Sequence, residues 1–259
     1  MDYALPVVTV VLAWWASTII VMYRAGLPER SYLKTLAGAT FALAAGLLAL
    51  FASVYAGGLA GVYLGFFAGL LVWVWHEVTY LFGFVTGPRP EPCPPDVRGW
   101  KRFVRGVQTC VYHELAIIAT AAVLAIVTWN ADNKVALWTF CVLWFMRWSV
   151  KLNIFLGVRN LHFEYLPAHL GYLKTFVRKR SMNELFPLSM LVSVSVFLLL
   201  VAAAIGAPAA SAAAVGATLL ATLLGLAILE HGLLVVNFDD SFLWRLGLRS
   251  RRNRRTAAG

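Results

Sequence analysis

Long apolar stretches separated by polar links run through the whole chain. A helix that crosses a membrane needs about 20 mostly apolar residues, and seven stretches reach this length. We predict spanning helices at residues 4–23, 34–55, 58–84, 107–129, 135–157, 187–205 and 212–236. The predicted fold class is an all-α polytopic membrane protein with seven transmembrane helices.

Composition supports this class. The 259 residues are 61% hydrophobic and 13% charged, with a mean hydropathy of +0.75, whereas a soluble domain is about 45–50% apolar and 25% charged. The polar links are too short to fold alone, so we expect a single integral membrane domain over 1–259. The first three residues lack the basic region of a cleaved signal peptide, so the first apolar stretch is expected to remain as an anchor. The three cysteines have no CxxC spacing, which argues against a disulfide framework or a zinc knuckle.

Basic residues are distributed unevenly between the two sets of links. Of the 22 lysines and arginines, 19 fall in or directly beside the links 24–33, 85–106 and 158–186 and the tail 237–259, and Arg147 and Lys151 lie near the same side inside the fifth span; only Lys134 is opposite. The positive-inside rule then predicts that the N-terminus lies outside and the C-terminus lies in the cytoplasm. The net charge of +10 therefore belongs to one face, where attraction to anionic lipid explains it without a nucleic-acid partner.

Two segments of this face are predicted to lie on lipid. Residues 166–180 have apolar positions near helical spacing beside basic ones, which predicts one cytoplasmic amphipathic helix in the headgroup plane. Residues 237–259 form a basic cytoplasmic tail. The side chains expected to face anionic lipid are Lys174, Arg178, Lys179, Arg180, Arg251, Arg252, Arg254 and Arg255.

Small residues predict close helix packing in the third span. Glycines recur at every fourth position, at Gly57, Gly61, Gly65 and Gly69, and such a stripe lets two backbones approach closely. The second span offers a matching surface of small residues: Gly38, Ala42, Ala45, Gly46 and Ala49. At 100° per residue, His76 falls on the same face as the glycines and should point into the protein.

The most informative polar feature is an adjacent His–Glu pair in each of three spans: His76-Glu77, His113-Glu114 and, reversed, Glu230-His231. The fifth span adds Arg147 and Lys151, which share one helix face. All of these groups are predicted at about 9–12 Å below the cytoplasmic surface. An ionisable group in the hydrocarbon costs about 3 kcal/mol, so we expect these residues to form a structural cluster or a ligand site.

The structural alternative is a polar layer in which the glutamates pair with Arg147 and Lys151 and hydrogen-bond to the histidines, which fixes helix register. A proton or ion path would use the same groups, but the chain has no internal repeat and no clearly broken pair of helices. A retinal protein is excluded because the last span has no lysine.

Two ligand alternatives remain open. Imidazole with carboxylate suits zinc or iron, and the candidate metal ligands are His76, Glu77, His113, Glu114, Glu230 and His231. Adjacent residues lie 100° apart on a helix, and neither Glu-x-x-His nor HExxH is present. Alternatively, one of the three histidines is an axial ligand to a tetrapyrrole metal, beside the planar apolar surfaces of Trp73, Trp75, Trp144 and Trp148.

Several segments resemble the photosynthetic complex assembly protein 2 family, of PuhE type, from phototrophic bacteria. They are residues 76–89 (HEVTYLFGFVTGPR), 151–160 (KLNIFLGVRN), 182–187 (MNELFP) and 230–232 (EHG). The resemblance implies an inner (cytoplasmic or intracytoplasmic) membrane protein associated with photosynthesis genes near those for the reaction centre. It implies a role in reaction-centre or antenna assembly, or in bacteriochlorophyll supply, with those subunits and the pigment-synthesis machinery as partners. No catalytic residues are implied.

The leading expectation is therefore a non-enzymatic assembly factor, for which a tetrapyrrole ligand would be of bacteriochlorophyll type. The alternative is a membrane-embedded metal-dependent enzyme that acts on a pigment or an isoprenoid lipid.

Overall fold

Each apolar stretch forms a helix, because only internal hydrogen bonds can satisfy backbone N–H and C=O groups in lipid. The computed structural model describes residues 3–161 and 166–236. Its α-helices are α1 (Ala4–Ala25), α2 (Tyr32–Tyr55), α3 (Gly58–Leu81), α4 (Gly99–Gln108), α5 (Val111–Val127), α6 (Val135–Leu156), α7 (Leu185–Gly206) and α8 (Ala212–Leu233). Within the described residues, the links also contain the 3-10 helices η1 (Glu29–Ser31) and η3 (Ala168–Phe176). The described residues form no β-strand, and their one isolated bridge joins Val158 and Lys179.

Six helices of the described part are long and apolar enough to cross a membrane: α1, α2 continued from η1, α3, α6, α7 and α8. The predicted start of the fourth span, at residue 107, is wrong. The chain bends by 64° between α4 and α5, and α5 alone has 17 residues, about 25 Å of helix. Together, α4 and α5 give a bent seventh candidate span.

The bend is stabilised by the loop that precedes α4. His113 N–H donates to Thr86 O at 3.0 Å, and Arg89 N–H donates to Gln108 O at 3.2 Å. Gly87 lies so close to the break that a side-chain carbon there would collide with the backbone of Gln108 and Cys110. The loop thus pairs backbone groups on both sides of the break that a helix terminus leaves without an intrahelical partner.

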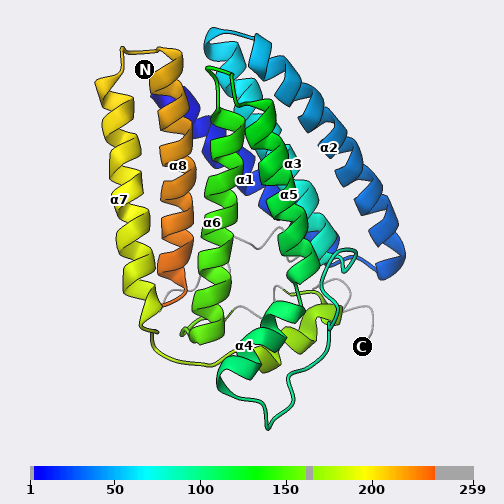
Figure 1. Ribbon diagram of the computed structural model, residues 1–259. Helices are drawn as coiled ribbons and strands as arrows, with labels where there is room; N and C mark the ends of the chain where they lie inside the picture. Colours follow the sequence, from blue (N-terminus) through cyan, green and yellow to red (C-terminus); the bar gives the residue numbers. More distant parts are fainter. Residues whose placement is uncertain (1–2, 162–165, 237–259) are drawn as a thin grey trace.

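The helix α3 lies at the centre of the bundle and packs against α2, α6 and α8, while α7 packs along α8 (Figure 1). One apolar core joins α3, α5 and α6 around Trp73, Ile117 and Phe140. A second core joins α1, α3 and α8 around Val10, Phe66 and Leu219. The central position of α3 explains why the first His–Glu pair is inside the protein.

Gly65 and Gly69 of the glycine stripe lie against Ala136, at the start of α6, so the predicted pairing with the second span is wrong for these two glycines. Gly61 does lie against the C-terminal end of α2, at Ser53 and Ala56. A side-chain carbon at Gly69 would lie 2.6 Å from Ala136 O and 2.9 Å from Thr139 Cβ. The helix α2 packs on a different side of α3, where Gly46 lies against Ala68 and Leu71. The stripe therefore sets the distance between α3 and α6, the helices that carry Glu77 and Arg147.

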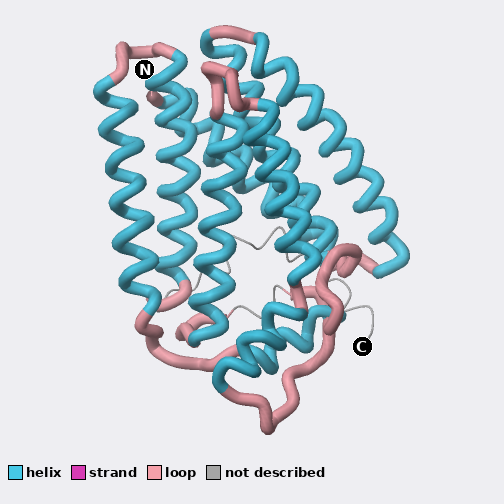
Figure 2. The backbone as a smooth tube through the Cα atoms, viewed as in Figure 1, coloured by secondary structure: helices cyan, strands magenta, loops and turns pink. Residues whose placement is uncertain are grey.

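The links alternate between the two ends of the bundle (Figures 1 and 2). The short links at 56–57, 128–134 and 207–211 lie at one end. The longer links, with α4 and η3, lie at the other, which we call the α4 end. The predicted grouping of the links is confirmed by this arrangement, whereas their orientation across a membrane stays a prediction.

The segment predicted as an amphipathic helix, 166–180, contains the 3-10 helix η3 and no α-helix. Leu170 and Phe176 of η3 are buried in the protein. The basic residues of the segment are exposed: Lys174, Arg178, Lys179 and Arg180. Their contact with lipid stays a prediction, and Arg251, Arg252, Arg254 and Arg255 lie outside the described residues.

Candidate functional site: a polar layer inside the bundle

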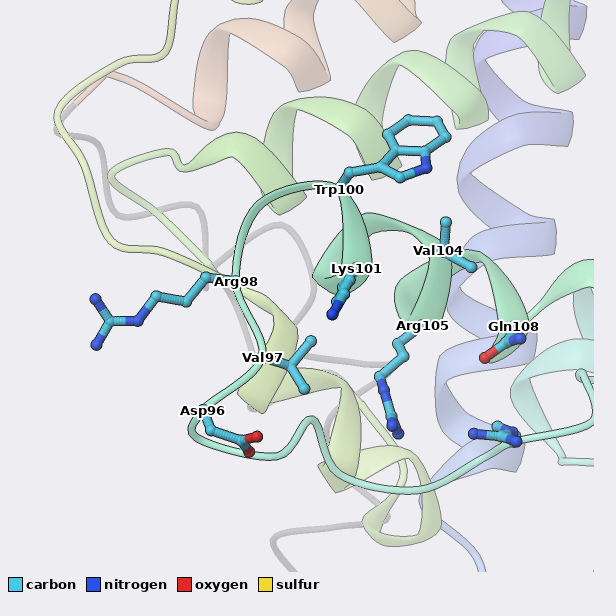
Figure 3. A pocket seen from close by; sticks show the side chains of 9 residues that line it. Asp96, Val97, Arg98, Trp100, Lys101, Val104, Arg105 and Gln108 are labelled. Carbon is cyan, nitrogen blue, oxygen red and sulfur yellow. The ribbon is translucent and has the colours of Figure 1, made fainter.

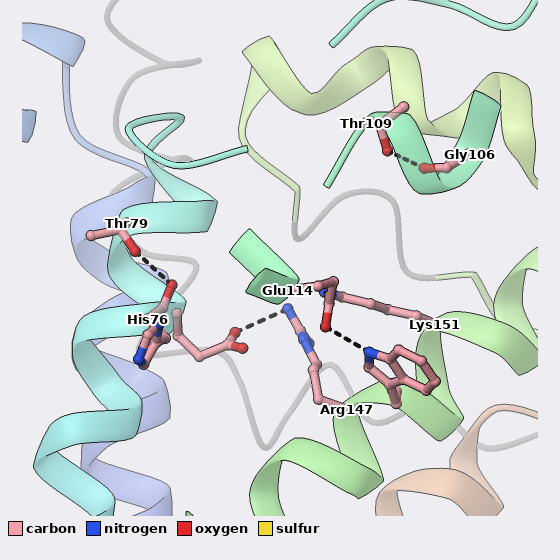
Figure 4. Close-up of polar contacts among 9 residues, drawn as sticks. His76, Thr79, Gly106, Thr109, Glu114, Arg147 and Lys151 are labelled. Atoms are coloured by element: carbon pink, nitrogen blue, oxygen red, sulfur yellow. Dashed lines mark hydrogen bonds and ion pairs between the residues drawn. The ribbon is translucent and has the colours of Figure 1, made fainter. Parts of the chain in front are cut away.

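Two ion pairs join three helices within the bundle (Figure 4). Arg147 of α6 meets Glu77 of α3 at 3.0 Å. Lys151, one turn further along α6, meets Glu114 of α5 at 2.6 Å. The two cations share a face of α6 because they are four residues apart, and α6 thereby binds both neighbouring helices through charge.

The Glu114 carboxylate has a second donor. Its Oε2 accepts a hydrogen bond from Trp148 Nε1 at 2.6 Å, while Oε1 accepts from Lys151 Nζ. Glu114 is itself 8% exposed. A buried carboxylate must be paired and hydrogen-bonded to offset its desolvation, and Glu114 has both contacts.

His76 and His231 bind to hydroxyl and carbonyl groups, and none of the three histidines hydrogen-bonds to a glutamate among the described residues, so the expectation that they do is wrong. His231 Nδ1 lies 2.9 Å from Ala227 O, and His231 Nε2 lies 2.9 Å from Ser149 Oγ. Because a carbonyl only accepts, Nδ1 carries the proton and Nε2 accepts from the serine hydroxyl. His76 Nε2 lies 3.0 Å from Thr120 Oγ1.

His113 has a different environment. Its ring is 0% exposed, stacks on Tyr80 with ring centroids 4.6 Å apart, and lies 6.3 Å from the His76 ring. Neither of its nitrogens has a hydrogen-bond partner among the described residues, and His76 Nδ1 also has none. Lys151 Nζ lies 4.7 Å from the Tyr80 ring centroid, so His113, Tyr80 and Lys151 form one contiguous contact.

Glu230 joins the layer only through longer-range electrostatics. It is half-buried on α8 and interacts electrostatically with Arg147, but it lies beyond ion-pair distance of the described cations. The first two His–Glu pairs thus converge through α6. The third contributes His231 to a bond with Ser149 of α6 and leaves Glu230 at the edge of the layer.

The described residues do not form the metal site of the first ligand alternative, whereas ligation of a tetrapyrrole stays a prediction. Across residues 3–161 and 166–236, no three His, Cys, Asp or Glu side chains are grouped as a metal site requires. The carboxylates of Glu77 and Glu114 are directed to cations instead. For a tetrapyrrole, His231 has both nitrogens engaged, and the buried His113 stacks on Tyr80. His76 Nδ1 has no hydrogen-bond partner among the described residues, so axial ligation by a histidine stays a prediction.

A polar contact joins α6 and α7 at the α4 end. Asn153 is fully buried and donates to Ser189 Oγ at 3.1 Å. Asn183, which has no predicted role, donates to Asn153 Oδ1 at 3.0 Å and to Gly157 O at 3.1 Å, and its Oδ1 accepts from the N–H groups of 185 and 186. An asparagine just before an apolar run is a helix N-cap signal, and this signal could have revealed Asn183.

Arg102 is another residue whose role the charge pattern hid. It is 8% exposed, donates to the carbonyls of Phe176 and Phe155, and lies over the Phe155 ring at 4.3 Å. Arg102 therefore attaches α4 to the end of α6 and to η3, although the basic-residue count treated it as one more orienting charge.

These observations define a multi-pass α-helical membrane protein with an ion-paired layer between α3, α5 and α6. The chain belongs to the family described as "Protein of unknown function (DUF3623)", which matches residues 1–255. A Rhodobacter capsulatus protein described as "Uncharacterized 30.4 kDa protein in puhA 5'region" is 34% identical over 245 residues, which cover 91% of this chain and 87% of the relative. No solved structure matches the chain.

Proposed function

We propose that this protein is a non-enzymatic factor for assembly of the bacterial photosynthetic apparatus in the inner (cytoplasmic or intracytoplasmic) membrane. The observation that carries the proposal is the description of the 34% identical relative. That description places the relative in the puhA region of a phototrophic bacterium. The resemblance of residues 76–89 and 151–160 to the PuhE-type family supports the same role.

The geometry of the polar layer supports the non-enzymatic form of this proposal. Glu77 and Glu114 are each bound by a cation of α6, which lowers their availability as bases or metal ligands. A cluster of paired charges between helices stabilises one arrangement of those helices, because separating them would leave charges unpaired in lipid. The layer then acts as a rigid frame that keeps the outer surfaces of α5 and α6 in place.

Those outer surfaces offer contact area for partner helices. Large side chains of α5 and α6 are well exposed in the isolated chain: Tyr112, Leu115, Ile118, Trp138, Phe145 and Trp148. In a membrane such a surface contacts lipid or other spanning helices, and helix association there depends on packing and interhelical hydrogen bonds. The partners under this proposal are reaction-centre or antenna subunits, or the machinery that supplies bacteriochlorophyll to them.

The test is deletion of the gene in a phototrophic bacterium, with absorption spectra of isolated membranes. A role in assembly predicts that the deletion strain has weaker reaction-centre or antenna absorption bands and accumulates no new pigment intermediate. Reintroducing the intact gene should restore the bands. Affinity purification of the tagged protein from crosslinked membranes should recover one of those subunits. Accumulation of a modified pigment or isoprenoid precursor would favour the enzyme alternative, and unchanged spectra would contradict both.

Substitutions then separate a structural layer from a catalytic one. Glu77→Gln and Glu114→Gln should lower the amount of folded protein in the membrane and the photosynthetic bands in proportion. Variants that retain full protein level yet lose all function would contradict the structural role of the layer. The exposed Glu29→Gln change, outside the layer, is the control.

A further inference from the structure

A basic groove at the α4 end has no role in the polar layer. It is an open hollow of about 520 Å³ between α4 and the proline-rich loop before it. Four cationic side chains and one acidic one line it: Arg89, Arg98, Lys101, Arg105 and Asp96. Lys101 and Arg105 extend from the same side of α4 toward the loop (Figure 3).

The four cations of the groove are not used by the described part of the fold. None of their side chains makes a hydrogen bond or ion pair with another described side chain or carbonyl. Arg102 on the same helix is the opposite case, because its guanidinium is buried on the carbonyls of Phe155 and Phe176. Thus α4 uses one cation for attachment to the bundle and presents the others to whatever lies in the groove.

An apolar stripe lies beside the basic one on α4. Trp100, Val104 and Val107 recur at i, i+4 and i+7, and they are 73%, 37% and 40% exposed. A helix with an apolar face next to a basic face is typical of one that lies in the membrane interface, and tryptophan prefers that depth. The 64° bend to α5 turns α4 away from the direction of the spanning helix.

We propose that this groove binds the phosphate group of an anionic phospholipid, with Trp100, Val104 and Val107 in contact with the lipid's apolar part. Net positive charge selects an anion, and arginine guanidinium groups bind phosphate oxygens through paired donors. The apolar stripe selects a lipid rather than a soluble anion or an acidic protein segment. This site is distinct from the polar layer and does not depend on the proposed assembly role.

The experiment titrates the full-length protein in mild detergent with short-chain phosphatidylglycerol or phosphatidylcholine and counts bound lipid by native mass spectrometry. Lys101→Gln/Arg105→Gln should weaken phosphatidylglycerol binding about tenfold to thirtyfold, since each basic residue near a surface contributes about 1 kcal/mol. Phosphatidylcholine binding should change little. Trp100→Ala should also weaken phosphatidylglycerol binding, and circular dichroism should show that each variant is folded.

The matched control removes two exposed cations at the same end but outside the groove, as Arg30→Gln/Lys34→Gln, and should bind lipid like the wild type. Equal losses of phosphatidylglycerol binding in the two double variants would overturn the proposed site, because the lipid would then be bound by the general positive charge of the surface. Displacement of the lipid by inorganic phosphate at equal concentration would show a free-anion site and overturn the lipid assignment. Tighter binding of a polyglutamate peptide than of the lipid would overturn it in favour of an acidic protein.

Discussion

Glu114 combines an ion pair with a second side-chain hydrogen bond in the described polar layer. Both of its oxygens are bonded, to Lys151 and Trp148, and its side chain is largely buried. Glu114→Gln should lower the free energy of unfolding by about 3 kcal/mol, because removing one member of a buried ion pair leaves the other uncompensated. Thermal or denaturant unfolding in mild detergent measures the loss.

A double-mutant cycle tests whether this loss comes from the pair itself. Replacing Lys151 by Met in the Glu114→Gln protein should recover part of the stability, since the unpaired cation is then removed. Strict additivity of the two substitutions would contradict the pairing. Glu91→Gln, in an exposed loop, should leave stability unchanged.

The hydrogen bond between Ser149 and His231 should matter much less. Ser149→Ala removes the donor to His231 Nε2, and interhelical hydrogen bonds in membranes contribute about 0.6 kcal/mol on average. We expect a loss below about 1.5 kcal/mol in the same unfolding assay. A loss as large as that of Glu114→Gln would show that the histidine contacts, rather than the ion pairs, dominate the layer.

The eight candidate residues of the layer could be predicted from sequence, but their partners could not. The depth of a residue in the membrane follows from its position along a spanning helix. Residue counts alone therefore predict a similar depth for His76, His113 and Lys151. Partner choice depends on how each helix is rotated about its axis. For α3 that rotation is set by Gly69 against Ala136, a contact that no local pattern specifies.

At the scale of helices, the contact between α3 and α6 depends on glycine. Gly69→Leu should separate the two helices, because even the first side-chain carbon added at this position would lie 2.6 Å from Ala136 O. Separation would also weaken the Glu77–Arg147 pair further along the interface. We expect a clear fall in the unfolding midpoint, measured by differential scanning fluorimetry in detergent.

Gly38→Ala is the matched control for that substitution. Gly38 lies in α2, and no neighbouring atom lies within 4 Å of the position that an added side-chain carbon would take. Alanine should therefore be tolerated there and should favour the helix by up to about 1 kcal/mol. Similar destabilisation by both glycine substitutions would contradict the close-packing explanation, because an added side-chain carbon at Gly38 has no neighbouring atom to collide with.

The attachment of α4 rests on Arg102. Arg102→Ala should detach α4 from η3 and the end of α6 while leaving the spanning helices intact. Hydrogen–deuterium exchange should then rise in residues 99–108 and stay unchanged in α3. Lys101→Ala, at an exposed neighbour, should not raise exchange; equal effects of the two changes would contradict the role given to Arg102.

The ends of most helices could be predicted to within a few residues. The exception is the bend before α5, and it has a physical cause. The predicted spans at 4–23 and 212–236 correspond to α1 (Ala4–Ala25) and α8 (Ala212–Leu233), because length and hydropathy alone decide them. The bend before α5 was missed because it is stabilised by backbone bonds from Thr86 and Arg89. Such bonds come from a segment distant in sequence, and no property of the residues around 107–111 reveals them.

On the scale of the whole molecule, the two ends differ in charge. The short links at the end opposite α4 contain Lys134 as their single basic residue, and Lys134 and Asp132 belong to the same link. The longer links at the α4 end contain many lysines and arginines. The positive-inside rule counts such residues in short loops, so the α4 end is predicted to lie in the cytoplasm.

Cysteine labelling in intact cells tests this orientation. In a protein with serine at Cys93, Cys110 and Cys141, one new cysteine replaces the exposed Asp132 or the exposed Glu91. A membrane-impermeant maleimide should label Asp132→Cys in intact cells, because that link is predicted to lie outside. It should label Glu91→Cys only after the membrane is opened. The reverse pattern would place the basic groove and the α4 end outside the cell and would contradict a topology set by the charge difference between the two ends.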